Sequence, residues 1–352
     1  MNYKQITENL LSWYDASHED MPWRGESDAY KIWVSEIMLQ QTQVTTVIDY
    51  YQRWIKRFPT INDVASASID EILKLWEGLG YYSRARNFHE SCKQLANSDS
   101  KVPDNFDDFL NLKGVGPYIA SAVQSIAYNF PCAVIDGNVN RVVSRMNMFD
   151  IDPLKNKKNI QIFMDKILCK QRPGDFNQAI MDLGRYICKP QNPICDECPL
   201  KSACKAFKVN QQAAYPIKMK KKPKPHYNVA VGIIWDESKI LITKRKESGL
   251  LGGLWEFPGG KIKKKENVFN AVKREIKEEL SINVMPKELI HEVDHHYSHF
   301  SVTIRAIDCV YKSGKIELNA ATDYKWISPA QLYDFAFPKA SIKLFNSIKG
   351  IT

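Results

Sequence analysis

The chain has 352 residues, of which 44% are hydrophobic and 25% are charged, a composition typical of a globular protein and not of a disordered one. At roughly 150 residues per domain, this length corresponds to two or three domains. No stretch approaches the ~18 consecutive apolar residues of a membrane span, and residues 1–8 lack the layout of a signal peptide. We therefore expect a soluble protein of the cytoplasm.

The net charge of +9 is concentrated in one short segment, residues 201–225, which holds eight lysines and no acidic residue. Basic runs of this kind are most often solvated linkers. Contact with phosphates is the alternative interpretation, and it needs a supporting site elsewhere in the chain.

A change of pattern divides the chain into an all-α part and an α/β part. In residues 1–207, apolar side chains recur at helical spacing, as they do around Trp33 and Trp76. Residues 208–226 are interpreted as a basic Pro/Lys linker. In residues 227–352, strand-like runs flank one amphipathic helix, which indicates an α/β domain; the runs are 229–234, 240–242 and 302–304, and the helix is 268–280.

Four of the eight cysteines lie close together with the spacing C-x6-C-x2-C-x5-C, namely Cys188, Cys195, Cys198 and Cys204. Four thiolates within this span can converge on one metal centre. Disulfides are an alternative, but they are rare in a reducing cytosol. Only one pair has the spacing of a structural zinc knuckle, so an iron–sulfur cluster is favoured over zinc. The scattered cysteines are interpreted as small buried apolar residues, namely Cys92, Cys132, Cys169 and Cys309.

A glycine-rich turn precedes a predicted helix of small residues at 119–123. Gly114 and Gly116 permit positive φ angles and a close approach of the backbone. The free N–H groups at the start of the following helix then favour a bound phosphate. An ordinary helix–helix turn is the alternative.

The cysteine spacing and this turn resemble the endonuclease III family of DNA glycosylases, and the resemblance covers the whole first domain. It implies a loop, residues 188–204, in which the four clustered cysteines hold a 4Fe–4S cluster. It also implies that Gly114 and Gly116 belong to a helix-hairpin-helix motif, which holds the DNA backbone without reading its sequence.

Two acidic residues are candidates for the chemistry. Asp136 ends an apolar run just before a predicted helix, where a simple N-cap is the alternative. Glu36 lies among apolar neighbours on a helix, where desolvation raises the pKa of a carboxyl group. Such a group suits a general acid, and cleavage of a glycosidic bond needs one acid and one carboxylate. A glutamate on a solvated helix face is the alternative for Glu36.

Three strings resemble the adenine DNA glycosylases (the MutY family), which remove adenine mispaired with 8-oxoguanine; they are residues 33–42, 76–84 and 136–139. The resemblance implies that Glu36 protonates the adenine ring and that Asp136 stabilises the deoxyribose cation or bonds to it. Tyr118 and Asn138 would assist at the same centre. Further implied contacts are those of Arg24 and Gln178 with the adenine, and of Gln41 and Tyr81 with the base stack from which the adenine is flipped.

Position 118 separates this family from its main rival. Glycosylases that also cut the backbone use a lysine there as a Schiff-base nucleophile, whereas this chain has Tyr118. We therefore expect base removal without efficient strand cleavage. The rivals are an endonuclease III-like glycosylase for oxidised pyrimidines and a catalytically silent DNA-binding protein.

The second domain resembles the Nudix fold. The pattern Gly260-x5-Glu266-x7-Arg274-Glu275-x2-Glu278-Glu279 matches the Nudix box, with Ser281 where the box has glycine. In Nudix hydrolases, the acids corresponding to Glu275, Glu278 and Glu279 hold Mg²⁺ against a diphosphate. Hydrolysis of oxidised nucleoside triphosphates is therefore an alternative function of this domain.

In adenine glycosylases the Nudix-like domain instead recognises 8-oxoguanine. The resemblance implies that Tyr297, Ser298 and His299, together with Thr42, read the lesion, with Ser298 as the hydrogen-bonding partner. The expected partner is double-stranded DNA containing an A·8-oxoguanine or A·G mispair, bound by a monomer that would associate with the nucleoid in a bacterium. No protein partner is indicated.

Overall fold

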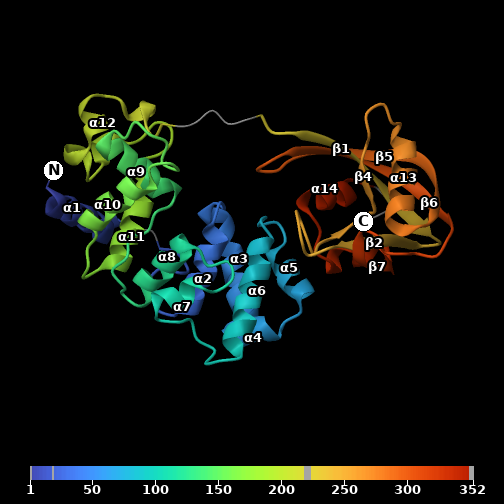
Figure 1. Ribbon diagram of the computed structural model, residues 1–352, viewed down its shortest axis with the longest axis horizontal. Helices are drawn as coiled ribbons and strands as arrows, with labels where there is room; N and C mark the ends of the chain where they lie inside the picture. The colour runs from blue at the N-terminus through green and yellow to red at the C-terminus, as the bar shows by residue number, and fades with distance from the viewer. Residues whose placement is uncertain (1, 18–19, 218–222, 349–352) are drawn as a thin grey trace. The chain divides into compact units, whose positions relative to one another are not determined.

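The computed structural model describes residues 2–17, 20–217 and 223–348 (Figure 1). Its contacts divide the chain into two compact units, Met1–Ser66 with Glu90–Lys221, and Ala67–His89 with Lys222–Thr352. The domain limits at 207 and 227 stay a prediction, and residues 218–222 of the predicted linker lie outside the described residues. None of the described helices has the length and apolar character of a membrane span.

The described part of residues 2–217 is helical and contains no strand, as predicted. Its longer helices are α1 (Tyr3–Ser17), α2 (Ala29–Leu39), α3 (Val44–Arg57), α4 (Ile61–Ser66), α5 (Ile69–Trp76), α6 (Ser83–Ala96), α7 (Phe106–Leu110), α8 (Pro117–Ala127), α9 (Gly137–Asn147), α10 (Lys157–Ile167) and α11 (Pro173–Asp182). Shorter turns follow at Leu183–Ile187, Cys195–Glu197, Lys201–Ala203, α12 (Lys205–Lys208) and Gln212–Ala214.

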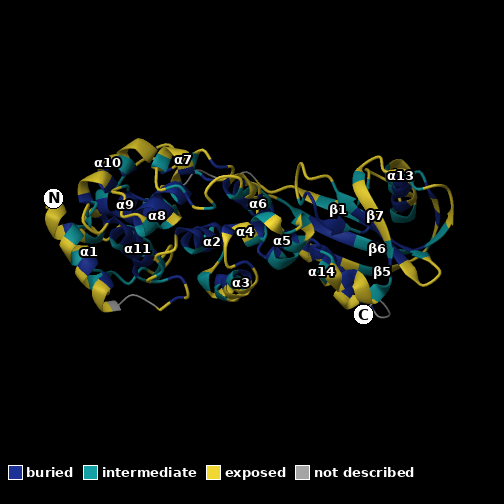
Figure 2. Cartoon of the chain, turned by 90° about the horizontal axis from the view of Figure 1, so that it is seen from below, coloured by how far each residue is buried: buried dark blue, intermediate teal, exposed yellow. Residues whose placement is uncertain are grey.

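Helix α2 is the central helix of the first unit and is buried on nearly all sides (Figure 2). It begins where the Asp28 side chain accepts a hydrogen bond from the backbone N–H of Tyr30, an N-cap that satisfies one free donor. Trp33 and Val34 are almost fully buried, and α2 packs against α8. A helix that is apolar all round belongs in a core, so a polar side chain on α2 is desolvated too.

The second unit is built around a seven-stranded sheet whose main path is β3-β2-β1-β6-β5, with β4 paired to β1 and β7 to β2. Among the strands of the described residues, β1 and β6 pair in parallel and the other pairs are antiparallel. The strands are β1 (His226–Asp236), β2 (Lys239–Arg245), β3 (Trp255–Glu256), β4 (Gly259–Lys261), β5 (Asn283–His296), β6 (Ser301–Ser313) and β7 (Ala321–Ile327).

Alternate residues of β1 face two separate cores, which makes this unit a helix–sheet–helix sandwich. Ala230 and Ile234 pack in the core that contains α13 (Val268–Leu280), whereas Val231 and Ile233 pack in the core that contains α14 (Lys339–Ser347). A six-residue 3-10 helix, Pro329–Asp334, precedes α14.

The expected elements of the second unit are confirmed, and the strands are longer than predicted. Helix α13 has the predicted limits, and its C-cap Ser281 has a left-handed backbone with φ 59°. Of the scattered cysteines, Cys92 and Cys309 are buried, but Cys132 and Cys169 are only partly buried. The prediction was wrong for these two because they lie in loops, Cys132 between α8 and α9 and Cys169 after α10, beside exposed residues.

Replacing Ser281 with glycine should stabilise the protein by about 1 kcal/mol, because a left-handed backbone costs an L side chain roughly that much. Thermal unfolding of the full chain measures the change. Ser281→Ala is the matched control, since alanine keeps the Cβ atom and should not stabilise. Equal melting temperatures for the two variants would contradict the explanation.

Candidate active site

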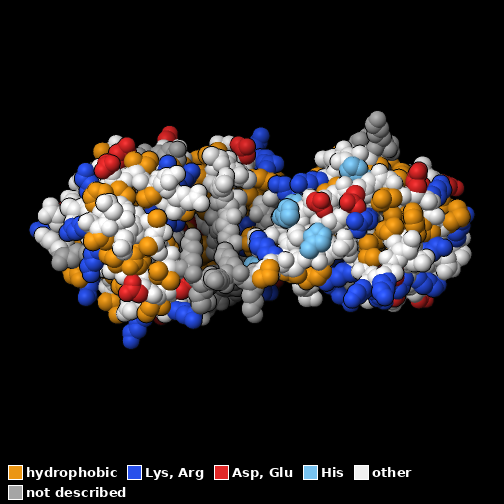
Figure 3. Space-filling model, turned by 90° about the horizontal axis from the view of Figure 1, so that it is seen from above, with side chains coloured by type: hydrophobic (Ala, Val, Ile, Leu, Met, Phe, Trp, Pro, Cys, Tyr) orange, Lys and Arg blue, Asp and Glu red, His pale blue; other side chains and the backbone are white. Residues whose placement is uncertain are grey.

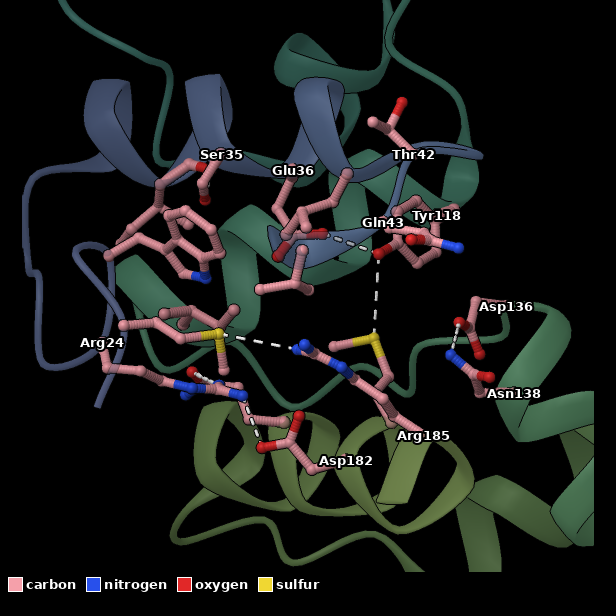
Figure 4. A pocket seen from close by; sticks show the side chains of 18 of the residues that line it. Arg24, Ser35, Glu36, Thr42, Gln43, Tyr118, Asp136, Asn138, Asp182 and Arg185 are labelled. Carbon is pink, nitrogen blue, oxygen red and sulfur yellow. Dashed lines mark hydrogen bonds and ion pairs between the residues drawn. The ribbon is translucent and has the colours of Figure 1, made fainter. Parts of the chain in front are cut away.

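Glu36 projects from α2 into a cavity of about 410 Å³ in the first unit (Figure 4). Its side chain is 5% exposed, and Tyr118 Oη donates a hydrogen bond of 2.7 Å to Glu36 Oε2. Tyr118 lies in the first turn of α8, which packs on α2. The packing of these two helices therefore brings the phenol to the acid.

Asp136 lines the same cavity from the N-terminus of α9. Its Oδ1 accepts a hydrogen bond of 2.7 Å from the Val139 N–H, and its Oδ2 accepts one of 3.0 Å from Asn138 Nδ2. Asp136 is thus an N-cap, the alternative weighed for it, and it also faces the cavity. The structure brings Glu36 and Asp136 to one site, although they are far apart in the chain.

The two carboxyl groups differ in what surrounds them. Burial raises the pKa of Glu36, and the Tyr118 hydrogen bond and the Arg24 charge oppose this rise only in part. Burial also raises the pKa of Asp136, but two backbone N–H groups, Arg141 and the Asn138 side chain all favour its charged form. The arrangement therefore favours Glu36 as the proton donor and Asp136 as the anion.

One wall of the cavity is a polar cluster around Arg24. Its Nη1 donates to Gln178 Oε1 and its Nη2 donates to Asp182 Oδ2, and the side chains of Arg24 and Asp182 are 11% and 7% exposed. Arg24 and Gln178 line the cavity as the resemblance implies. Asp182 was missed, although its position four residues after Gln178 on α11 puts it on the same helix face.

The four clustered cysteines surround a small cavity of about 30 Å³. Arg145, 2% exposed, donates a hydrogen bond of 3.3 Å to Cys188 Sγ and bonds to the carbonyl oxygens of Lys189 and Pro190. Among the described residues, no three Cys, His, Asp or Glu side chains are arranged to hold a single metal ion. Four thiols around one cavity, with a buried guanidinium hydrogen-bonded to one sulfur, are the ligand type that an iron–sulfur cluster takes.

Arg141 links this cysteine loop to the acidic site. Its Nη2 donates to Asn138 Oδ1 at 2.8 Å and to the Gly184 carbonyl at 2.6 Å, and its Nε donates to the Cys188 carbonyl at 2.7 Å. Asn138 in turn holds Asp136. The orientation of Asp136 therefore depends on the position of the loop.

The glycine turn lies at the start of α8, as predicted, but the two glycines differ. Gly114 has φ +84°, a left-handed conformation that favours glycine. Gly116 has φ −99° and is the N-cap of α8, so only Gly114 of the two adopts the positive φ that glycine permits. A Cβ atom on Gly116 would meet nothing within 4 Å, which leaves open space in front of the helix N-terminus.

The remaining predicted contacts lie outside the acidic cavity, apart from Thr42, which lines it. Gln41 and Tyr81 have positive φ angles, 58° and 48°, a strained geometry common at functional sites. Tyr297, Ser298 and His299 form the β5–β6 turn, where the ring of Tyr297 stacks on Phe300 at 4.6 Å and the other two are exposed.

The Nudix-box acids are engaged in ion pairs. Arg274 contacts Glu266 and Glu275, each at 2.7 Å, and Glu278 at 3.2 Å. Burial raises the pKa of Glu279 to about 7, with the charge of Glu256 adding to the effect. The single charge of Arg274 offsets only part of the charge of these three carboxylates, but its contacts occupy oxygens of Glu275 and Glu278 that a Mg²⁺ ion would use. The arrangement therefore gives no support to the possible Mg²⁺ site.

Comparisons with known proteins agree with this geometry. The family described as "HhH-GPD superfamily base excision DNA repair protein" matches residues 34–168, and the family described as "NUDIX domain" matches residues 230–347. The chain is 32% identical to the adenine DNA glycosylase of Rattus norvegicus, covering 96% of this chain and 77% of the relative. It is also 32% identical to that of Buchnera aphidicola subsp. Schizaphis graminum, with 97% of both chains covered.

Solved structures match the helical part. A thermostable thymine-DNA glycosylase is 26% identical with a TM-score of 0.55, covering 59% of this chain and 97% of that one. An endonuclease III bound to DNA is 24% identical with a TM-score of 0.51, covering 60% of this chain and 99% of that one. The latter likeness concerns the fold alone.

Glu36→Gln should raise the melting temperature by at least about 2 °C at pH 8 and by less at pH 4.5. The raised pKa of Glu36 means that the wild-type protein loses stability as the pH rises through that value, whereas an amide does not titrate. Differential scanning calorimetry at both pH values measures the difference. Glu90→Gln, at an exposed position, is the control; an equal effect of both variants would contradict the argument.

Proposed function

The chain belongs to the adenine DNA glycosylase family, and from this premise we propose that it removes adenine paired with 8-oxoguanine or guanine in double-stranded DNA. The observation that carries the proposal is that Glu36 and Asp136 line one cavity with different hydrogen-bond surroundings. Glycosidic cleavage needs this combination of a proton donor and a carboxylate.

The reaction begins when the adenine leaves the duplex and enters the cavity beside Arg24 and Gln178. Unstacking the base costs a few kcal/mol, which contacts with the protein offset. The Glu36 carboxyl group donates its proton to the adenine ring, so the ring accepts the electron pair of the breaking glycosidic bond. Asp136, held by Asn138, stabilises the positive charge on the deoxyribose or bonds to it.

Base removal without efficient strand cleavage fits the cavity lining. Tyr118 stands where a Schiff-base lysine would be expected, and no lysine is among the described residues that line this cavity. Tyr118 instead donates a hydrogen bond to Glu36. The same feature disfavours the rival function, an endonuclease III-like glycosylase for oxidised pyrimidines.

The cysteines Cys188, Cys195, Cys198 and Cys204 would hold a 4Fe–4S cluster. The cavity that they surround and the hydrogen bond from Arg145 to Cys188 Sγ support this assignment. Such a cluster cross-links the loop that it occupies. Arg141 donates hydrogen bonds to both the Cys188 carbonyl and Asn138, so a fixed loop also fixes the position of Asn138.

The second unit would read 8-oxoguanine through Tyr297, Ser298 and His299. Thr42, which lines the acidic cavity, would also contact the lesion. Gly114, Gly116, Gln41 and Tyr81 would contact the DNA backbone and the base stack. Figure 3 shows lysine and arginine side chains in several clusters over the visible surface, which suits binding of a polyanion such as DNA.

Nucleotide hydrolysis by the second unit is the weaker candidate function, because Arg274 pairs with the box acids Glu266 and Glu275. We propose a cytoplasmic monomer, associated with the nucleoid in a bacterium.

The proposed function predicts that Glu36→Gln lowers the rate of adenine excision by at least ~100-fold, because the proton donor is lost. The measurement is single-turnover excision from a duplex with one A·8-oxoguanine pair, run with and without alkali treatment. Duplex binding should survive the substitution, and Glu90→Gln should excise at the wild-type rate. Unchanged excision by Glu36→Gln would refute the mechanism.

Ser298→Ala should reduce the preference for 8-oxoguanine over guanine opposite adenine about fivefold, because one hydrogen bond contributes roughly 1 kcal/mol. The ratio of excision rates on the two duplexes measures this preference. Ser313→Ala, at the far end of β6, is the matched control. A ratio equal to that of the wild type would place the reading loop elsewhere.

A further inference from the structure

A second cavity of about 350 Å³ lies beside the acidic one in the first unit, and we call it the rear chamber. It is formed by the end of α1, residues 24–26, the end of α8 and the start of α11. Its volume is within the range of ligand sites, roughly 300–1,000 Å³. Asn129 and Gln171, which line it, are exposed, so the chamber reaches solvent on their side.

Three side chains line both cavities and therefore form the partition between them, namely Arg24, Ile126 and Gln178. The hydrogen bond from Arg24 Nη1 to Gln178 Oε1 spans this partition. Arg24 Nε is buried and has no hydrogen-bond partner among the described residues. The partition is thus made of side chains, which can change rotamer without any movement of a helix.

We propose that the rear chamber receives the free purine base after cleavage and releases it to solvent while the DNA is still bound. This inference rests on the proposed function. It assigns the chamber a neutral, planar, nitrogen-rich ligand that is the product of the reaction.

The order of steps in the reaction requires an exit path for adenine that leads away from the DNA. When the glycosidic bond breaks, its electron pair stays on the adenine nitrogen and the ring carries the proton from Glu36. Asp136 holds the sugar from the opposite face, so water must attack the anomeric carbon from the face that adenine has left. The water oxygen bonds to that carbon and its proton returns to Glu36, which restores the acid. Adenine therefore has to move aside before water can attack.

The way back toward the DNA is obstructed at that moment. The sugar is still attached to the duplex and lies at the mouth through which the base entered. The rear chamber begins on the other side of the residues that contact the adenine, Arg24 and Gln178. A base that leaves the acidic cavity away from the sugar enters the chamber once the side chains of Arg24 and Gln178 change rotamer.

The lining of the chamber matches the edge of a purine. Gln178 and Asn129 carry both amide donors and acceptors, as adenine carries an amino group and ring acceptors. Tyr14 contributes an aromatic ring, which Arg24 also contacts with its guanidinium 5.7 Å from the ring centroid. Asp15 and Asp175 both pair with Arg172, at 2.6 and 2.8 Å, so the guanidinium offsets half of their combined charge. The remaining charge neither strongly attracts nor repels a neutral base.

The test narrows the outer end of the chamber and leaves the acidic cavity intact. Gln171→Trp adds bulk at an exposed position, and the double variant Gln171→Trp/Asp15→Trp adds more from the α1 side. Gln171→Ala is the matched control, because it removes the same amide without filling the chamber. None of these positions lines the acidic cavity.

A duplex with isotope-labelled adenine opposite 8-oxoguanine is reacted with excess protein under single-turnover conditions. Alkali cleavage reports excision, and filter capture of the protein–DNA complex reports how long the label and the duplex each stay bound. In the wild type, the label should leave several times faster than the duplex. In Gln171→Trp, excision should stay within about twofold while the label stays bound at least about fivefold longer, and the double variant should retain it longer still.

Two results would overturn the inference and leave the proposed function intact. One is excision by the wild type followed by departure of label and duplex at the same rate. The other is release of label by both tryptophan variants as fast as by Gln171→Ala. Failure of the wild type to excise adenine at all would instead overturn the proposed function, and this inference with it.

Discussion

Burial of the Glu36 carboxyl group is the constraint on which the rest of the active site depends. The acid sits on a helix that is enclosed by apolar neighbours, so its charged form is poorly solvated and its pKa is raised. A carboxyl group held in this way keeps its proton to a higher pH than a solvated one, and it also accepts a hydrogen bond from Tyr118. The same burial lowers the stability of the folded protein. A buried acid at this position is therefore explained by a role in the reaction and not by a contribution to folding.

The second acid, Asp136, is held in place at the N-terminus of helix α9. Asp136 caps α9, so the hydrogen bond that starts the helix also helps to keep the carboxylate charged. Gly184 fits closely against this region, because a Cβ atom there would lie 2.6 Å from the Cβ of Asn138. Arg141 then joins Asn138 to the cysteine loop. Local order at the loop and the orientation of Asp136 are thus parts of one hydrogen-bonded network.

The second unit has the Nudix fold, but the contacts of its box acids differ from those of free metal ligands. The sheet and α13 are those of a Nudix domain, and the box residues are present in the chain. Three of their carboxylates, those of Glu266, Glu275 and Glu278, however, form ion pairs with Arg274 within the protein. The exposed turn between β5 and β6 is therefore the better candidate for contact with a ligand.

The sequence by itself determined the features that depend on neighbouring residues. The period of apolar side chains around Trp33 predicted α2, and the limits of α13 followed from its apolar face. The left-handed conformation at Ser281 could be expected from the position of the residue after that helix. Each of these is set by backbone angles and hydrogen bonds that close within a few residues. The cysteine spacing likewise indicated a metal centre before any geometry was known.

Tertiary structure decided whatever depends on contacts between distant segments. It brought Glu36 and Asp136 to one cavity, added Asp182 to the wall, and used the positive φ that glycine permits at Gly114 but not at Gly116. It also paired Arg274 with the box acids, which the pattern alone presented as free metal ligands. Burial and ion pairing are properties of the packed chain, because desolvation of a group is set by every helix that covers it. For that reason the residue types could be identified from the sequence, and their electrostatic states could not.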